Sequence, residues 1–173
     1  MPNLSQNIPN SGILKNVQIL VVDNDFDSRY LCETLFESHG AKVLTAEFIA
    51  DALTLLDHFL PDILICEIRF LDEDIRLLIR RARAIALGQN RIIPILVASA
   101  YCSASFAQDL IEDMESHLSK PIDIDALVDE VWNLVHLSQA LCQTNIQGWV
   151  ANHRLWKKPA SWSSQTIFEK NLA

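Results

Sequence analysis

The sequence predicts a doubly wound α/β domain whose five parallel strands follow the order 2-1-3-4-5. Three observations support it: five short strand-like runs of which three are almost wholly apolar, helical patterns between them, and polar residues where several runs end. Runs that are apolar throughout are typical of strands covered on both faces. Because helices connect successive strands, each connection is a crossover and the sheet is parallel. Such a sheet has its ligand cleft between the first and third strands.

The predicted strands are short, and the first, third and fourth are mostly apolar with frequent β-branched residues. In chain order they are residues 17–22, 42–46, 61–67, 92–98 and 116–119. Pro61 and Asp62 introduce the third run as turn formers. Pro94 lies near the start of the fourth, where a missing N–H is tolerated.

Two helices are predicted in the first half of the chain. Asp27 or Ser28 is a suitable N-cap for the first, and Gly40 is well placed to end it. In the second, apolar residues recur at i, i+3, i+4 and i+7 from Ile49, which is the spacing of a helix with one buried face. Pro61 closes the linker that follows.

Three further helices are predicted in the second half. The third covers about residues 75–87 and is stopped by Gly88. The fourth covers about residues 105–114. Asp123 caps the fifth, whose apolar stripe continues until the pattern breaks near residue 139.

Composition limits the classes of function. Half of the 173 residues are hydrophobic and 21% are charged, which is typical of a globular protein. The net charge of −8 disfavours nonspecific binding to nucleic acid. No apolar run approaches the roughly 18 residues that cross a bilayer, and the polar N-terminus lacks a signal core, so we expect a cytoplasmic protein without a membrane partner. The four widely spaced cysteines predict small buried side chains rather than a metal or redox site.

Polar residues follow four of the five strands at the edge where the carboxyl ends meet. They are Asp23, Asn24, Asp25, Glu67, Ser99 and Lys120. Glu67 alone could simply be an acid that leaves the core and is solvated. Several acids around one cleft, however, repel one another unless a cation offsets them, and Mg²⁺ prefers oxygen ligands. Lys120 is a candidate ion-pair partner for Glu67.

Four short segments, each of which is a weak signal alone, together have an order and spacing that are specific for one family of domains. They are Ile19 to Asp23, Pro61-Asp62, Pro94 to Ala100 and Ser119-Lys120-Pro121. With these segments the chain resembles the receiver domains of two-component response regulators over about residues 16–137. The resemblance implies a flavodoxin-like fold and a regulatory role in phosphorelay signal transduction, not an enzyme.

The resemblance also implies a role for each polar residue at this carboxyl edge of the sheet, which we call the rim. In that family an acidic pair after the first strand holds a metal, and an aspartate that ends the third strand accepts the phosphoryl group. A hydroxyl and a lysine contact that group, and an aromatic residue of the fifth strand is the switch. The corresponding residues, in that order, are Asp23 and Asn24 with Asp25 beside them, Glu67, Ser99, Lys120 and His117. No cofactor is certain, and Mg²⁺ would have Asp23 and Glu67 as its ligands.

Three positions depart from the family pattern. Asn24 replaces an acid, so the cleft loses a charge that attracts Mg²⁺, and His117 replaces the usual aromatic residue. Glu67 is one methylene longer than aspartate, and a displacement of about 1 Å can cost about 100-fold in rate. Our hypothesis is a pseudo-receiver, in which the Glu67 carboxylate is pushed outward, pairs with Lys120 and resembles a phosphoryl group in charge.

Two alternatives remain open. One is a conventional Mg²⁺-dependent receiver in which Glu67 still accepts a phosphoryl group. The other is an enzyme on the same fold, either a flavin carrier or a small hydrolase. A flavin carrier would need a Ser/Thr/Gly-rich loop after the first strand, where the chain has Asp23 to Phe26, and a hydrolase would need a GxSxG turn.

The predicted organisation is a flexible segment at 1–15, a receiver-like domain at 16–138 and a basic tail at 139–173. Three tryptophans in the tail either pack on the domain near Trp132 or bind a partner. The tail is short for a helix-turn-helix output domain, so we expect a stand-alone module that acts by protein–protein interaction and does not bind DNA. The resemblance implies a sensor kinase or other signalling protein as partner, and a homodimer through helix 4, strand 5 and helix 5.

Overall fold

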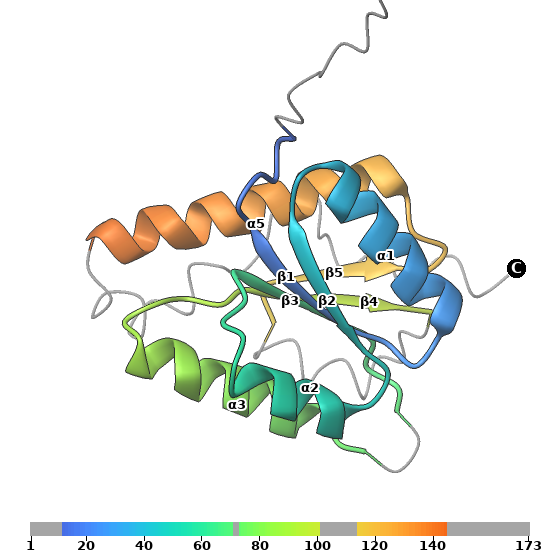
Figure 1. Cartoon of the computed structure of the whole chain (residues 1–173), viewed down its shortest axis with the longest axis horizontal. Coiled ribbons are helices and arrows are strands. Elements are labelled where there is room, and N and C mark those ends of the chain that lie inside the picture. Colours follow the sequence, from blue (N-terminus) through green and yellow to red (C-terminus); the bar gives the residue numbers. More distant parts are fainter. Residues whose placement is uncertain (1–11, 71–72, 101–113, 145–173) are drawn as a thin grey trace, which may run out of the picture.

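The computed structural model describes residues 12–70, 73–100 and 114–144 (Figure 1). Its elements are β1 (Gln18–Val22), α1 (Phe26–Ser38), β2 (Lys42–Ala46), α2 (Ile49–Leu56), β3 (Ile63–Cys66), α3 (Ile75–Gly88), β4 (Ile95–Ser99), β5 (Ser116–Ser119) and α5 (Ile124–Thr144). Most of the helix predicted at 105–114 lies outside the described residues.

The five strands form one parallel sheet in the order β2-β1-β3-β4-β5. The predicted fold class and strand order are therefore confirmed. In register, Val22 lies opposite both Ala46 and Cys66, and Cys66 lies opposite Val97. The residues that follow these strands consequently leave the sheet at one common edge.

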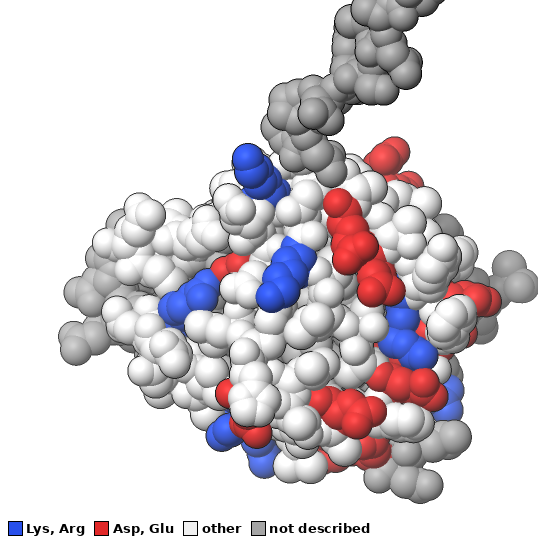
Figure 2. Space-filling view, viewed as in Figure 1, with Lys and Arg blue, Asp and Glu red and all other residues white. Residues whose placement is uncertain are grey.

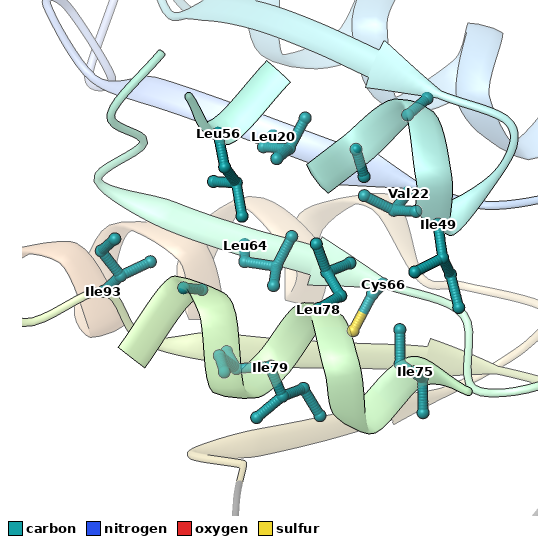
Figure 3. Packing of buried hydrophobic residues seen from close by; sticks show 14 of the residues in the cluster. Leu20, Val22, Ile49, Leu56, Leu64, Cys66, Ile75, Leu78, Ile79 and Ile93 are labelled. Atoms are coloured by element: carbon teal, nitrogen blue, oxygen red, sulfur yellow. The ribbon is translucent and has the colours of Figure 1, made fainter. Parts of the chain in front are cut away.

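Helices cover both faces of the sheet, with α1 and α5 on one side and α2 and α3 on the other (Figure 1). The side chains of β1 alternate between these two layers. Leu20 and Val22 pack in the cluster beneath α2 and α3, which Figure 3 shows, whereas Ile19 and Val21 pack in the cluster beneath α1 and α5. Both sets are buried, which explains why the strand is apolar without interruption from Ile19 to Val22.

Helix α1 begins earlier than the sequence predicts. Its N-cap is Asp25, in an extended conformation with φ −88° and ψ 120°, rather than Asp27 or Ser28. The Asp25 carboxylate accepts hydrogen bonds from the backbone N–H of Ser28 at 2.9 Å and from its hydroxyl at 2.7 Å. Gly40 follows the helix with φ +87°, a conformation that favours glycine and fits its predicted role as the helix stop.

The connection from α3 to β4 also differs from the prediction. Helix α3 includes Gly88, and the chain turns at Asn90, which has a positive φ of 55°. Strand β4 begins at Ile95 rather than at residue 92. Pro94 lies just before the strand and cannot donate a hydrogen bond, but its carbonyl accepts one from the N–H of Leu64 at 3.0 Å.

Both predicted end segments overlap parts of the folded domain. Leu14 is fully buried, and its N–H donates to the carbonyl of His39 at 3.0 Å. Residues 12–15 therefore pack on the domain instead of forming part of a flexible segment. At the other end, α5 continues beyond residue 139 to Thr144. The remainder of both end segments, including the three tail tryptophans, lies outside the described residues.

Two of the cysteines are buried, as predicted, and behave as apolar side chains. Burial raises the pKa of the Cys32 thiol to about 11 and that of Cys66 to about 12, so both are protonated at neutral pH. Cys142 is half-buried, and Cys102 lies outside the described residues. None of the helices in the described ranges combines the length and apolar character needed to cross a bilayer.

Charged side chains of both signs are interspersed on the face that Figure 2 shows, with no single large basic patch there. Several are neutralised by neighbours, such as Arg81 by Asp57 at 2.7 Å and Arg29 by Glu47 at 3.0 Å. A mixed surface of this kind favours solubility and does not provide a track for a polyanion on this face.

Candidate functional site

The carboxyl edge of the sheet brings four of the predicted site residues together. Asp23 follows β1, Glu67 follows β3, Ser99 ends β4 and Lys120 follows β5. All four are largely or fully shielded from solvent: the exposed fraction is 4% for Asp23, 6% for Glu67 and 1% for Ser99. Their side chains form one hydrogen-bonded network, because the parallel register ends these strands at the same level.

Lys120 lies between the two carboxylates. Its Nζ is 2.5 Å from Oδ2 of Asp23 and 3.3 Å from Oε2 of Glu67. The predicted pairing with Glu67 is therefore present, but the shorter contact is to Asp23. Burial lowers the pKa of Lys120, and the hydrogen bond and negative charge of Asp23, aided by Glu67, outweigh it, so the pKa is raised overall. The ammonium is thus held in its charged form.

Asp23 is a buried acid, and its surroundings have opposing effects on its pKa. Burial raises the pKa of its carboxyl group, while the hydrogen bond from Lys120 and one from the N–H of Asp25 act in the opposite direction. The latter bond joins the Asp25 nitrogen to Oδ1 of Asp23 at 2.9 Å. Both oxygens of Asp23 therefore accept hydrogen bonds from the protein itself.

Glu67 turns inward rather than outward, contrary to the prediction. Its Oε1 accepts a hydrogen bond from the hydroxyl of Ser99 and another from the N–H of Ile68 at 2.8 Å, with the N–H of Arg69 at 3.3 Å. The extra methylene explains this, because it lets the carboxylate fold back onto the backbone amide of the next residue. The carboxylate consequently occupies the interior of the rim.

The other two members of the predicted acidic pocket point elsewhere. Asn24 is exposed, and its Nδ2 donates to the carbonyl of Arg69 at 3.0 Å. Asp25 is the N-cap of α1, and the hydrogen bonds from Ser28 lower the pKa of its carboxyl group. Asp25 therefore does not compensate for the amide at position 24. Of the three, Asp23 alone contributes a carboxylate to the network.

His117, predicted at the switch position, is half-buried on β5 and lies opposite Val97. Burial lowers the pKa of its imidazole, and the negative charge of Glu67 acts in the opposite direction. The imidazole is therefore neutral at physiological pH, and it lies close enough to Glu67 to sense that charge.

Arg29 is a site neighbour that the sequence did not predict. Its Nη1 donates to the carbonyl of Asp23 at 2.7 Å and its Nη2 to Glu47 at 3.0 Å. The guanidinium also lies over the ring of Phe26, 5.9 Å from the centroid. Arg29 thus fixes the backbone at the end of β1. The position of Arg29 in the first turns of the helix after β1 could have indicated this role. An arginine at such a position is, however, equally typical of an exposed helix surface.

Mg²⁺ does not fit the donors as they stand. No group of three His, Cys, Asp or Glu residues in the described ranges is placed to hold a metal ion. Asp23 and Glu67, the two candidate ligands, direct one oxygen each at Lys120, and their other oxygens accept backbone or hydroxyl hydrogen bonds. An added cation would have to displace the ammonium before it could reach either carboxylate.

Comparisons with known proteins agree with this geometry. The family model of the response regulator receiver domain matches residues 19–132. An uncharacterised 14.6 kDa protein from the sodA1 3′ region of Leptolyngbya boryana is 32% identical over 111 residues, which are 64% of this chain and 83% of that protein. The transcriptional regulatory protein ZraR of Escherichia coli O157:H7 is 28% identical over 132 residues, which are 76% of this chain but 28% of ZraR.

A solved structure shows the same fold. The CheY-like response regulator receiver domain protein from Methanospirillum hungatei JF-1 superposes with a TM-score of 0.66 at 16% identity, covering 73% of this chain and 98% of that one. Its low identity supports the fold alone, whereas the family match covers well over half of the chain. This chain belongs to the response regulator receiver domain family of two-component signalling.

Proposed function

We propose that this protein is a pseudo-receiver, a regulatory module in which Glu67 does not accept a phosphoryl group. One observation supports this above all: the Glu67 carboxylate already binds the groups that the family uses for the phosphoryl group. Its Oε1 accepts the hydroxyl of Ser99, and its Oε2 faces Nζ of Lys120. Glu67 thus holds in place, by its own charge, the two donors that phosphorylation would otherwise recruit.

The same contacts oppose phosphoryl transfer to Glu67. A nucleophilic carboxylate needs an oxygen that can approach phosphorus in line with the leaving group. Both oxygens of Glu67 are engaged, and charge-assisted hydrogen bonds of this kind are about twice as strong as neutral ones. Approach would require breaking at least one of these hydrogen bonds within a buried site, which costs free energy.

Incubation with a small acyl-phosphate donor and Mg²⁺, followed by intact mass measurement, tests the proposal. We expect no gain of a phosphoryl group by the wild-type protein. The Asn24→Asp/Glu67→Asp variant, which restores the two family acids, serves as the comparison. A stoichiometric gain of one phosphoryl group in the wild type, abolished by Glu67→Gln, would instead establish the conventional phosphoacceptor receiver.

We propose that the module acts by protein–protein contact, through the surface of the helix predicted at 105–114, β5 and α5, and that it forms a homodimer there. Exposed apolar side chains on α5 support an interaction: Leu137 is 52% exposed and Trp132 is 40% exposed. Most of the fourth helix lies outside the described residues. Light scattering of the wild type and of Leu137→Glu tests this surface, because only a dimer that uses it should dissociate on substitution.

A further inference from the structure

Helix α5 covers one face of the sheet (Figure 1), and one side of it presents two acids and an aromatic pair to solvent. Asp125, Asp129, Trp132 and His136 are spaced at i, i+4, i+7 and i+11, so they form one row along the helix, which we call the acidic row. The Trp132 indole stacks on the His136 imidazole with 4.1 Å between ring centroids, and Nδ1 of His136 lies 2.8 Å from the carbonyl oxygen of Trp132. The indole is thus held as a flat apolar surface beside the acids.

The two carboxylates of the acidic row lack a counter-ion in the part of the chain that the structure describes. Neither Asp125 nor Asp129 forms an ion pair or a side-chain hydrogen bond with another described residue. Carboxylates beside an indole suit a basic side chain, which can pair with the acid and lie over the ring. A second copy bound through the same row would instead bring like charges together across a two-fold axis. The row therefore fits a basic segment better than it fits itself.

The sequence that follows α5 has the complementary composition. Residues 145–173 contain four Lys or Arg and one Glu, a net charge of +3 within a chain of net charge −8, so the remaining residues carry −11. Three of the four basic residues lie within 154–158, on both sides of Trp156. We call residues 154–158 the basic segment, and its charged residues are Arg154, Lys157 and Lys158.

The basic segment can reach the acidic row of its own molecule. Lys157 is 13 residues beyond Thr144, the last residue of α5, and an extended chain of that length spans up to about 43–47 Å. The row lies 12 to 19 residues before Thr144, from Trp132 to Asp125. At a rise of 1.5 Å per residue, the return along the helix is about 18–29 Å. The connection is therefore long enough for the chain to turn and run back along α5.

We infer that the basic segment binds the acidic row of the same molecule, with its charged side chains against Asp125 and Asp129 and over the indole of Trp132. Each such contact is weak at an exposed surface. Because a short connection joins the two partners, their effective concentration is about millimolar, which lets several weak contacts act together. Another protein that uses this side of α5 must then displace the segment. The inference goes beyond the proposed function, since it holds whether or not Glu67 accepts a phosphoryl group.

Zero-length carbodiimide cross-linking of the full chain tests the inference, with light and ¹⁵N-labelled protein mixed in equal amounts. The reagent joins only a carboxylate and an amine that touch, so mass spectrometry should find amide links from Asp125 or Asp129 to Lys157 or Lys158 within chains of one isotope. Trp132→Ala keeps all the reacting groups but should lower the yield by about threefold, because the cation–π contact is lost. Leu137→Ala removes an exposed apolar side chain outside the row and should leave the yield unchanged.

A second measurement does not depend on the cross-linking reagent. In protein labelled with 5-fluorotryptophan, the ¹⁹F resonance of Trp132 should shift when Lys157 and Lys158 are both replaced by Gln. Lys170→Gln removes a lysine of the same stretch outside the basic segment and should leave that resonance in place. Links between chains of different isotopes alone would assign the row to a second copy and overturn the inference. The absence of any link, together with an unmoved Trp132 resonance, would overturn it as well.

Discussion

The hydroxyl of Ser99 should contribute measurably to the free energy of unfolding. The residue is 1% exposed, and its hydroxyl donates to the buried carboxylate of Glu67. Ser99→Ala would remove a donor while leaving the carboxylate in place. Because loss of a partner for a buried polar group costs about 1–3 kcal/mol, we expect the free energy of unfolding to fall by that amount. Urea unfolding followed by circular dichroism measures it.

Ser119→Ala provides the matched control for that experiment. Ser119 is also a serine at the carboxyl end of a strand, β5, but it is exposed. Its replacement should change the free energy of unfolding by no more than about 0.5 kcal/mol. Equal effects of the two substitutions would show that the Ser99 hydroxyl contributes nothing specific to the buried network.

The position of a site residue on the sheet could be predicted from the sequence, but the direction in which its side chain points could not. Glu67 and Lys120 were placed at strand ends by the apolar runs before them, and they do meet. The inward turn of Glu67 depends on a hydroxyl from β4 and on its own backbone amide, which no local pattern reveals. The predicted pocket at residues 23–25 failed in the same way, since two of its three side chains bond elsewhere.

At the scale of one element, the cap of α1 predicts a pH-dependent stability. The hydrogen bonds from the Ser28 side chain and backbone lower the pKa of Asp25 from its ordinary 3.8. A lowered pKa in the folded state means that the stabilisation is present above pH 3.8 and is lost as the pH falls through the lower folded value. Asp25→Ala should therefore cost about 0.5–2 kcal/mol at pH 7 and progressively less in acid.

Denaturant unfolding at pH 7 and at several lower pH values checks this prediction. Asp27→Ala is the control, because Asp27 lies in the first turn of the same helix but is not its N-cap. It should show at most the smaller charge–dipole effect of about 0.3–1 kcal/mol. A cost for Asp25→Ala that stays unchanged as the pH is lowered far below 3.8 would contradict a role for the ionised cap.

Elements were predictable where one physical pattern dominates. β1, β3 and β4 are buried on both faces, so each is almost wholly apolar in the sequence, whereas β2 and β5 are only partly buried and mix polar with apolar residues. All five were located. The first residues of helices were harder to predict. At the start of α1, for example, Asp25, Asp27 and Ser28 are all suitable N-caps by residue type. Helix α2 starts after Phe48, which has no side-chain acceptor, and the distant Glu73 binds the N–H groups of Ile49 and Ala50 instead.

For the whole molecule, ion pairs with at least one buried carboxylate join segments at both edges of the sheet. At the carboxyl edge Lys120 joins Asp23 to Glu67. At the opposite edge Asp62 accepts from the N–H of Gln18 at 2.8 Å and pairs with Arg91. Each pair connects segments far apart in sequence, so its stabilisation depends on the complete strand order. The strand order itself was predictable because crossover connections leave few arrangements.

The packing of Leu14 predicts that the folded unit begins near residue 12 rather than 16. The side chain is fully buried in the cluster beneath α1 and α5, and its N–H bonds to His39. Removing a buried leucine typically costs about 2–5 kcal/mol. A chain that starts at residue 16 should therefore unfold at lower urea concentration than one that starts at residue 12, by at least about 2 kcal/mol in free energy.

Two point substitutions in the full chain show whether Leu14 itself is responsible for that difference. Leu14→Ala should reproduce most of the loss, because it empties the same position beneath α1 and α5. Ile13→Ala removes a neighbouring aliphatic side chain that is 54% exposed and should cost much less. If chains starting at 12 and at 16 were equally stable, the turn before β1 would lie on the domain without contributing to its core, and the boundary at residue 16 would stand.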